Sequence, residues 1–162
     1  MTNLEELYRQ VIMDHYKNPR NKGLVNDLKY KTMHIKNPTC GDDITVQSKI
    51  ENGKVVDVKQ DGKGCSICCS SASVMSEVLI GKTTEEAKQI TKTYLEMLTN
   101  KPYDKTVDLE GAIVYQGVNK FPARIKCASI AWKAFEKTLD ETEWIFNEWA
   151  NKKWDKRDHW GL

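Results

Sequence analysis

The chain has 162 residues, with 25 Lys and Arg against 23 Asp and Glu, and a net charge of +2. This near-neutral balance, without one basic block, argues against nucleic-acid binding. No apolar run approaches the roughly 18 residues of a membrane span, and the polar, acidic residues 1–6 are unlike a secretory signal. We therefore expect one soluble domain in the cytoplasm, without a nucleic-acid or membrane partner.

Five cysteines are present, an odd number. In a reducing cytoplasm this favours metal or persulfide chemistry over a disulfide framework. A chain of this length buries roughly 68–70% of its unfolded surface, so it needs no disulfides to be stable.

The first predicted element is an amphipathic helix. Thr2 and Asn3 are N-cap candidates, apolar residues follow at helical spacing, and Asn18-Pro19 ends the pattern. A β segment follows, with loose alternation over residues 30–36 and clear alternation over residues 44–50.

Asn52-Gly53 is a strong hairpin signal, and a returning strand begins with Val55, Val56 and Val58. Three antiparallel strands are therefore predicted. The first of them leads directly into a loop that contains Cys40.

From Cys65 onward the pattern is helical. It continues through Ile80 and ends at Gly81, and Thr83 or Thr84 caps a second helix that runs to Leu98. Residues 99–121 are interrupted by proline and glycine. Pro122 then begins another helix, with Cys127 in its second turn. The predicted class is α+β, a small three-stranded antiparallel sheet with helices packed on one face.

We place the domain at residues 1–139 and a tryptophan-rich tail at residues 140–162. The tail holds four of the five tryptophans. Two interpretations stay open for it, packing back onto the domain and docking of a partner.

Four residues form a candidate metal site: Cys40, Asp42, Cys65 and Cys127. Three thiolates and one carboxylate make a complete tetrahedral set for zinc. Gly64 allows a close backbone approach before Cys65, and a helix start favours a thiolate there. The spacings are long, however, and single cysteines are often small buried residues. Spacing alone leaves both readings open.

The sequence around these residues resembles a known family. The segments Asn37-Pro-Thr-Cys-Gly-Asp42, Gly62-Lys-Gly-Cys-Ser-Ile67 and Phe121-Pro-Ala-Arg-Ile-Lys-Cys127 resemble the signature blocks of the IscU/SufU family of iron–sulfur cluster assembly proteins. The opening helix, with Tyr8, Asp14-His15-Tyr16 and Asn18-Pro19, is similar as well. The resemblance runs from about Leu4 to about Leu139 and implies an IscU/NifU N-terminal-like fold.

Two features resemble the SufU branch more than IscU proper. Lys126 stands where IscU proteins carry a histidine, and residues between Gly81 and Phe121 are numerous enough to include the insertion of SufU proteins.

The resemblance implies that Cys40, Asp42, Cys65 and Cys127 bind one zinc ion and that Cys40 accepts sulfur. Arg124, three residues before Cys127, is a candidate catalytic neighbour, and its alternative is an ordinary exposed arginine.

The function implied by the resemblance is that of a zinc-dependent sulfurtransferase. It would accept persulfide sulfur from a cysteine desulfurase with pyridoxal phosphate, for iron–sulfur cluster biogenesis, after a partner histidine displaces Cys40 from the metal. One alternative is a scaffold that binds iron or a labile 2Fe–2S cluster and works with other iron–sulfur assembly proteins. The other is an adaptor with a structural zinc.

Cys68 and Cys69 depart from the family, whose members usually have no thiol at these positions. They are interpreted as small buried residues, with a thiol near the metal or a competing ligand as alternatives. Cys65-Ser-Ile-Cys68 matches a redox motif without the βαβ context that the motif needs. No histidine is assigned to the metal, and capping of the first helix is the simplest role for His15.

Overall fold

A computed structural model describes residues 3–38 and 41–139. The predicted tail, residues 140–162, lies outside them. No helix in the described part of the chain is long and apolar enough to cross a membrane. The elements, in chain order, are α1 (Asn3–Lys17), β1 (Tyr30–Asn37), β2 (Asp42–Glu51), β3 (Lys54–Lys63), α2 (Ser66–Leu79), α3 (Thr84–Leu98), the 3₁₀ helix η1 (Glu110–Lys120) and α4 (Pro122–Leu139).

The strands form one antiparallel sheet in the order β1-β2-β3. The predicted hairpin joins β2 to β3, and Asn52 and Gly53 both have positive φ angles, 52° and 74°. Such a turn matches the right-handed twist of the two strands. It fixes the register, so that alternate side chains of β2, such as Ile44 and Val46, are buried on one face.

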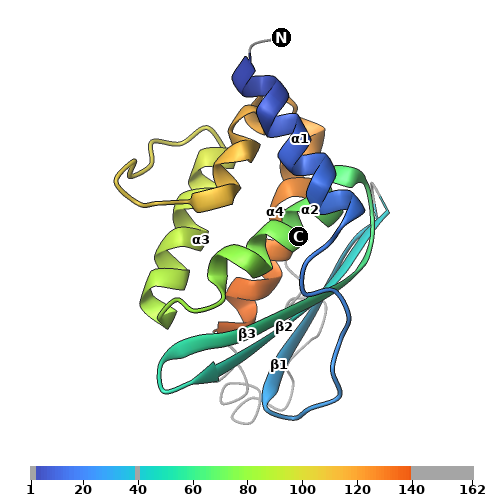
Figure 1. The fold of residues 1–162 in the computed structure, drawn as a ribbon, viewed down its shortest axis with the longest axis vertical. Coiled ribbons are helices and arrows are strands. Elements are labelled where there is room, and N and C mark those ends of the chain that lie inside the picture. The colour runs from blue at the N-terminus through green and yellow to red at the C-terminus, as the bar shows by residue number, and fades with distance from the viewer. Residues whose placement is uncertain (1–2, 39–40, 140–162) are drawn as a thin grey trace, which may run out of the picture.

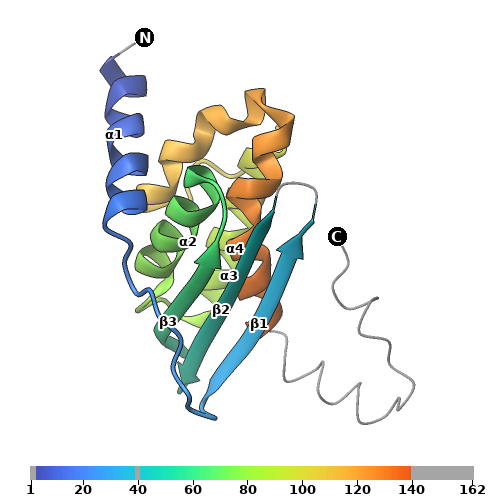
Figure 2. The same cartoon turned by 90° about the vertical axis from the view of Figure 1, so that its right-hand side faces the viewer.

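The helices of residues 3–38 and 41–139 all lie on that face of the sheet (Figures 1 and 2). α2 and α4 pack directly on the strands, α3 and η1 lie outside them, and α1 packs on α2. The predicted fold class is thereby confirmed.

The predicted helix boundaries also hold. Thr83 caps α3 through a capping box with Glu86, Gly81 follows α2 with a φ of 91°, and α4 begins at Pro122.

η1 is an element that the sequence pattern did not indicate. Its glycines lower helix propensity, so local preference alone favours an irregular segment over residues 99–121. Tertiary contacts hold it instead. Tyr115 is fully buried, and its hydroxyl donates a hydrogen bond of 2.6 Å to Ser70 Oγ on α2.

The core between the helices combines aromatic rings with serine hydroxyls. Tyr94 of α3 stacks on Trp132 of α4, with ring centroids 4.0 Å apart. Trp132 Nε1 donates to Ser71 Oγ at 3.0 Å, and Ser71 Oγ donates to the carbonyl of Ala128 at 2.7 Å. The same carbonyl accepts from the Tyr94 hydroxyl at 2.9 Å. Because these polar atoms are all partnered, burying them costs little.

The capping role expected for His15 is wrong. Its side chain is 5% exposed and points to α2, where Nδ1 lies 2.8 Å from Ser73 Oγ. The backbone N–H of Arg20 donates to the same oxygen at 2.8 Å. Burial lowers the pKa of His15, the charge of Arg20 lowers it further, and Glu77 and Asp14 oppose the shift. His15 therefore ties α1 to α2 as a neutral ring.

We expect His15 to make stability depend on pH. Because its folded pKa lies below the unfolded value of 6.5, the unfolded chain takes up the proton first as pH falls through 6.5. The free energy of unfolding therefore decreases progressively as the pH falls below this value, because protonation of His15 favours the unfolded chain. Urea titrations from pH 8 to pH 5 should show this loss, and His15→Gln should flatten it. An unchanged slope in the variant would contradict the assignment.

Candidate metal centre

Three residues from distant parts of the chain bring metal-binding atoms together. Asp42, Cys65 and Cys127 each offer one ligand atom, and these atoms all lie within 4.8 Å of one another. In a tetrahedral zinc site with Zn–S bonds near 2.3 Å, the sulfurs lie about 3.8 Å apart. A small movement of the three side chains toward one another therefore gives the geometry that zinc needs. The three residues are positioned to bind a metal ion.

Asp42 opens β2 directly opposite Asn37, the last residue of β1. Gly41 precedes it with a φ of 74°, a conformation that suits glycine, and its N–H donates to the Asn37 carbonyl at 2.9 Å. The Asp42 side chain is 1% exposed and accepts from the backbone N–H of Cys65 at 3.3 Å. A buried carboxylate in this position is costly unless a cation or hydrogen bonds compensate it.

Cys65 is the N-cap of α2. Its sulfur accepts from the backbone N–H of Cys68 at 3.4 Å, the role that a serine or aspartate oxygen usually has. The sulfur therefore lies at the N-terminus of the helix, where backbone N–H groups are without partners inside the helix.

Gly64, immediately before Cys65, allows β3 and α2 to approach Asp42. A Cβ at this position would lie 2.5 Å from Asp42 Oδ1 and 3.1 Å from Cys68 Sγ. The close approach expected from the sequence is therefore present.

Cys127 lies in the second turn of α4 and is 2% exposed. Burial raises the pKa of its thiol, and hydrogen bonds with Asp42 and Cys65 raise it further. The next residue, Ala128, has the carbonyl that accepts from Ser71 and Tyr94. These two hydroxyls, which sequence reasoning missed, position α4 and hence Cys127. The available signal was the run of small residues Ser70-Ser-Ala-Ser73 inside a helix.

Arg124 is exposed and lies beside the two thiols. Its pKa is raised, first by the charge of Cys65 and a hydrogen bond to it, and then by the charge of Cys127. The structure thus places Arg124 beside Cys65 and Cys127, and its catalytic role stays a prediction. A guanidinium here brings positive charge next to the two sulfurs.

The fourth predicted ligand, Cys40, lies outside the described residues, and its part in the site stays a prediction. Among the described residues, the candidate ligand group contains neither Cys68 nor Cys69. Cys68 is fully buried, and burial raises the pKa of its thiol, as expected for a packed small residue. Cys69 is half-buried, and burial also raises the pKa of its thiol, although the charge of Lys22 opposes this.

The candidate ligand group of the described chain also contains no histidine. His15 binds Ser73, and His34 Nε2 lies 2.5 Å from Asp43 Oδ1. His159 lies outside the described residues.

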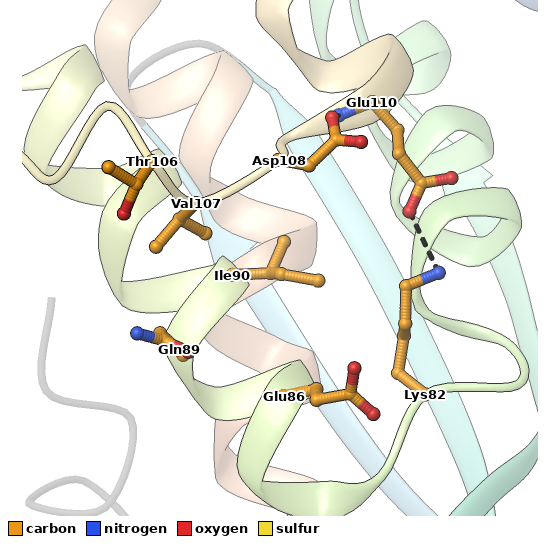
Figure 3. A pocket seen from close by; sticks show the side chains of 8 residues that line it. All are labelled: Lys82, Glu86, Gln89, Ile90, Thr106, Val107, Asp108 and Glu110. Atoms are coloured by element: carbon orange, nitrogen blue, oxygen red, sulfur yellow. Dashed lines mark hydrogen bonds and ion pairs between the residues drawn. The ribbon is translucent and has the colours of Figure 1, made fainter.

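A different hollow of about 360 Å³ lies between α3 and the segment that leads into η1 (Figure 3). An ion pair of 2.8 Å between Lys82 and Glu110 closes one side of it, and Glu86 and Asp108 add carboxylates. Its described lining contains no cysteine or histidine. It therefore lacks the nitrogen and sulfur ligands that zinc prefers.

Residues 7–138 match the family described as the NifU-like N terminal domain. This chain belongs to that family. The NifU-like domain is 50% identical to the zinc-dependent sulfurtransferase SufU of Bacillus subtilis (strain 168) over 141 residues, 87% of this chain and 95% of the relative. It is 34% identical to the iron–sulfur cluster assembly scaffold protein IscU of Streptococcus pyogenes serotype M1, over 86% of each chain.

Solved structures show the same NifU-like fold. A candidate iron–sulfur cluster assembly scaffold protein for the SUF system from Fervidobacterium islandicum AW-1 is 36% identical, with a TM-score of 0.71 over 82% of this chain and 96% of that one. The N-terminal part of a NifU-like protein from Brucella abortus has a TM-score of 0.72 over 88% and 98% of the two chains. At 20% identity, the second similarity shows the fold alone.

The closeness of Gly64 to Asp42 gives a test of the site. Gly64→Ala should force the Asp42 carboxylate away from Cys65 and weaken metal binding by about tenfold or more, in the range for disturbed support of a ligand. Competition with a chromogenic chelator measures this affinity.

Gly117→Ala is the matched control, because a Cβ there meets no atom within 4 Å. It should bind metal as the parent does. Equal affinities for all three proteins would contradict the role given to Gly64.

Proposed function

We propose that this protein is a zinc-dependent sulfurtransferase. In this proposal it accepts persulfide sulfur from a cysteine desulfurase with pyridoxal phosphate and supplies iron–sulfur cluster biogenesis in the cytoplasm. The observation that carries the proposal is the cluster of Asp42, Cys65 and Cys127 beside Arg124. The 50% identity with a relative named as a zinc-dependent sulfurtransferase supports it.

The donor set of the site fits zinc. Two thiols and one carboxylate are in place, and Cys40, two residues before Asp42, is proposed as the third thiol. Zinc, when bound, would stabilise the thiolate forms of its ligands at neutral pH. The buried Asp42 gives a hard, exchangeable ligand, whereas closed structural zinc sites usually contain only cysteine and histidine. This difference argues against a purely structural site.

The proposed chemistry is thiol exchange at Cys40. Its thiolate attacks the outer sulfur of the desulfurase persulfide, a new S–S bond forms at Cys40, and the desulfurase cysteine leaves as a thiolate. Arg124 supplies positive charge beside Cys65 and Cys127. This charge stabilises the negative sulfur that develops during the transfer. Arg124 is exposed, and in this proposal its guanidinium attracts the incoming persulfide, which is an anion.

The second candidate function is that of a scaffold for a labile 2Fe–2S cluster. It is favoured by the 34% identity with a relative named as an assembly scaffold and by the mixed thiolate and carboxylate set, which suits release of a cluster. Metal analysis separates the two functions. One zinc per colourless chain agrees with sulfur transfer, whereas a brown iron form that transfers its cluster to an apo-protein agrees with the scaffold.

Replacement of Cys40 by alanine should abolish sulfur acceptance, because no other thiol is proposed to carry the persulfide. The measurement is sulfide and alanine release by a cysteine desulfurase with the purified protein as acceptor. Cys68→Ala is the thiol control and should keep the activity, because Cys68 is buried and outside the ligand group. Full activity of the Cys40 variant, with its fold verified by circular dichroism, would refute the assignment.

Removal of the Arg124 guanidinium should slow transfer by about tenfold through loss of charge stabilisation near the reacting sulfur. Lys126 is a matched neighbour, because it is also cationic, exposed and on the same helix. Arg124→Ala should therefore lower the single-turnover rate of sulfur transfer, and Lys126→Ala should change it little. Equal rates for the two variants would reduce Arg124 to an ordinary surface residue.

A further inference from the structure

A cavity of about 240 Å³ lies between the C-terminal end of α1, the end of β3 and the start of α2. The linker that follows α1 runs alongside β3 (Figure 2), where Lys22 forms a parallel bridge with Gln60. Lys22 and Lys63 line the cavity, buried Ile44 contributes an apolar surface, and Cys69 contributes a thiol. The cavity therefore combines positive charge with a thiol.

Cys69 lines this cavity and does not belong to the metal centre. It is outside the group of Asp42, Cys65 and Cys127, and its sulfur makes only a long contact of 3.6 Å with the Gly64 carbonyl. The proposed sulfur transfer makes no use of this thiol. Cys69 is half-buried, and it is one of the residues that line the cavity.

The charge of the cavity favours an anion. Lys22 and Lys63 are exposed cations at its edge, and Tyr16 adds a hydroxyl to the lining. None of the described lining residues is acidic, although the carboxylate of Asp42 lies behind Gly64 and its charge also acts on Cys69. Its volume lies below the roughly 300 Å³ at which pockets for drug-sized ligands begin. A ligand of a few heavy atoms with a carboxylate therefore fits the size and the charge.

We propose that this cavity is a thiol-modification site, in which Cys69 forms a mixed disulfide with a small anionic disulfide whose carboxylate is bound by Lys22 and Lys63. Cys69 gives up its proton to solvent, and its sulfur attacks one sulfur of the disulfide. A new S–S bond forms, the original S–S bond breaks, and the other half leaves as a thiolate. Cys69 is oxidised and the small disulfide is reduced by the same two electrons. A small free thiol reverses the reaction.

The cavity and the metal centre share one wall. Gly64 lines the cavity and also packs against Asp42, and Cys69 lies one helical turn after Cys65. An adduct on Cys69 would replace the contact between its sulfur and the Gly64 carbonyl, at the segment that holds Cys65 in place. In this proposal, the ratio of small disulfides to thiols in the cell sets how much Cys69 carries an adduct. The adduct in turn changes the segment that positions Cys65 in the metal centre. This inference does not depend on the proposed sulfur transfer, because it requires only the cavity and its thiol.

Three small disulfides of similar size and different charge test the proposal on the full-length, zinc-loaded protein. Dithiodiglycolate is anionic, bis(hydroxyethyl) disulfide is neutral and cystamine is cationic. Peptide mass spectrometry after short incubations gives the rate of adduct formation at Cys69 itself. The anionic reagent should react at Cys69 about fivefold faster than the neutral one at low salt, and cystamine should be slowest. Added salt should reduce the difference.

The controls change charge inside and outside the cavity equally. The double variant Lys22→Gln and Lys63→Gln should lose the preference for the anionic reagent. The double variant Lys88→Gln and Lys92→Gln removes two exposed charges from α3 and should keep it. Cys69→Ser should lose the adduct altogether. Equal rates for the three reagents at Cys69, a preference that survives in the Lys22 and Lys63 variant, or adducts confined to other cysteines would each overturn the proposal.

Discussion

The hydrogen bonds to the Ala128 carbonyl decide where the thiols of this protein meet. Hydroxyls from α2 and α3 both donate to that one oxygen, and the Trp132 indole donates to the serine that supplies one of them. The carbonyl belongs to the residue after Cys127, so the same contacts set the position of Cys127 relative to Cys65. The buried network specifies one arrangement of α2 and α4, because any shift would leave polar atoms unpaired in the core.

The second constraint is the absence of a side chain at Gly64. A β strand and a helix start approach a buried carboxylate there, and a Cβ at this position would force the Asp42 side chain to move. The metal centre is therefore a product of packing between the sheet and the two helices that lie on it. Its ligands come from a strand start, a helix N-cap and a helix interior, and each position is fixed by hydrogen bonds that the metal itself does not make.

Charge is divided among neighbouring surfaces. Arg124 lies beside the thiols of Cys65 and Cys127, and Lys22 and Lys63 line a cavity to which Gly64 also contributes. Carboxylates gather at a different place, in the hollow between α3 and η1 (Figure 3). Cys65 and Cys127 thus lie beside Arg124, and Cys69 lies near Lys22. Such cations attract anionic sulfur compounds.

The sequence by itself determined the local elements, because hydrophobic periodicity, the Asn52-Gly53 turn, the Thr83 cap and Pro122 act over a few residues. It also determined the family, through three blocks of residues around the cysteines. Only the tertiary structure decided that Asp42, Cys65 and Cys127 converge, that η1 is helical, and that His15 is buried against Ser73. These features depend on contacts between residues as much as 85 positions apart, from Asp42 to Cys127. No local pattern encodes such contacts, because they arise only when the helices pack on the sheet.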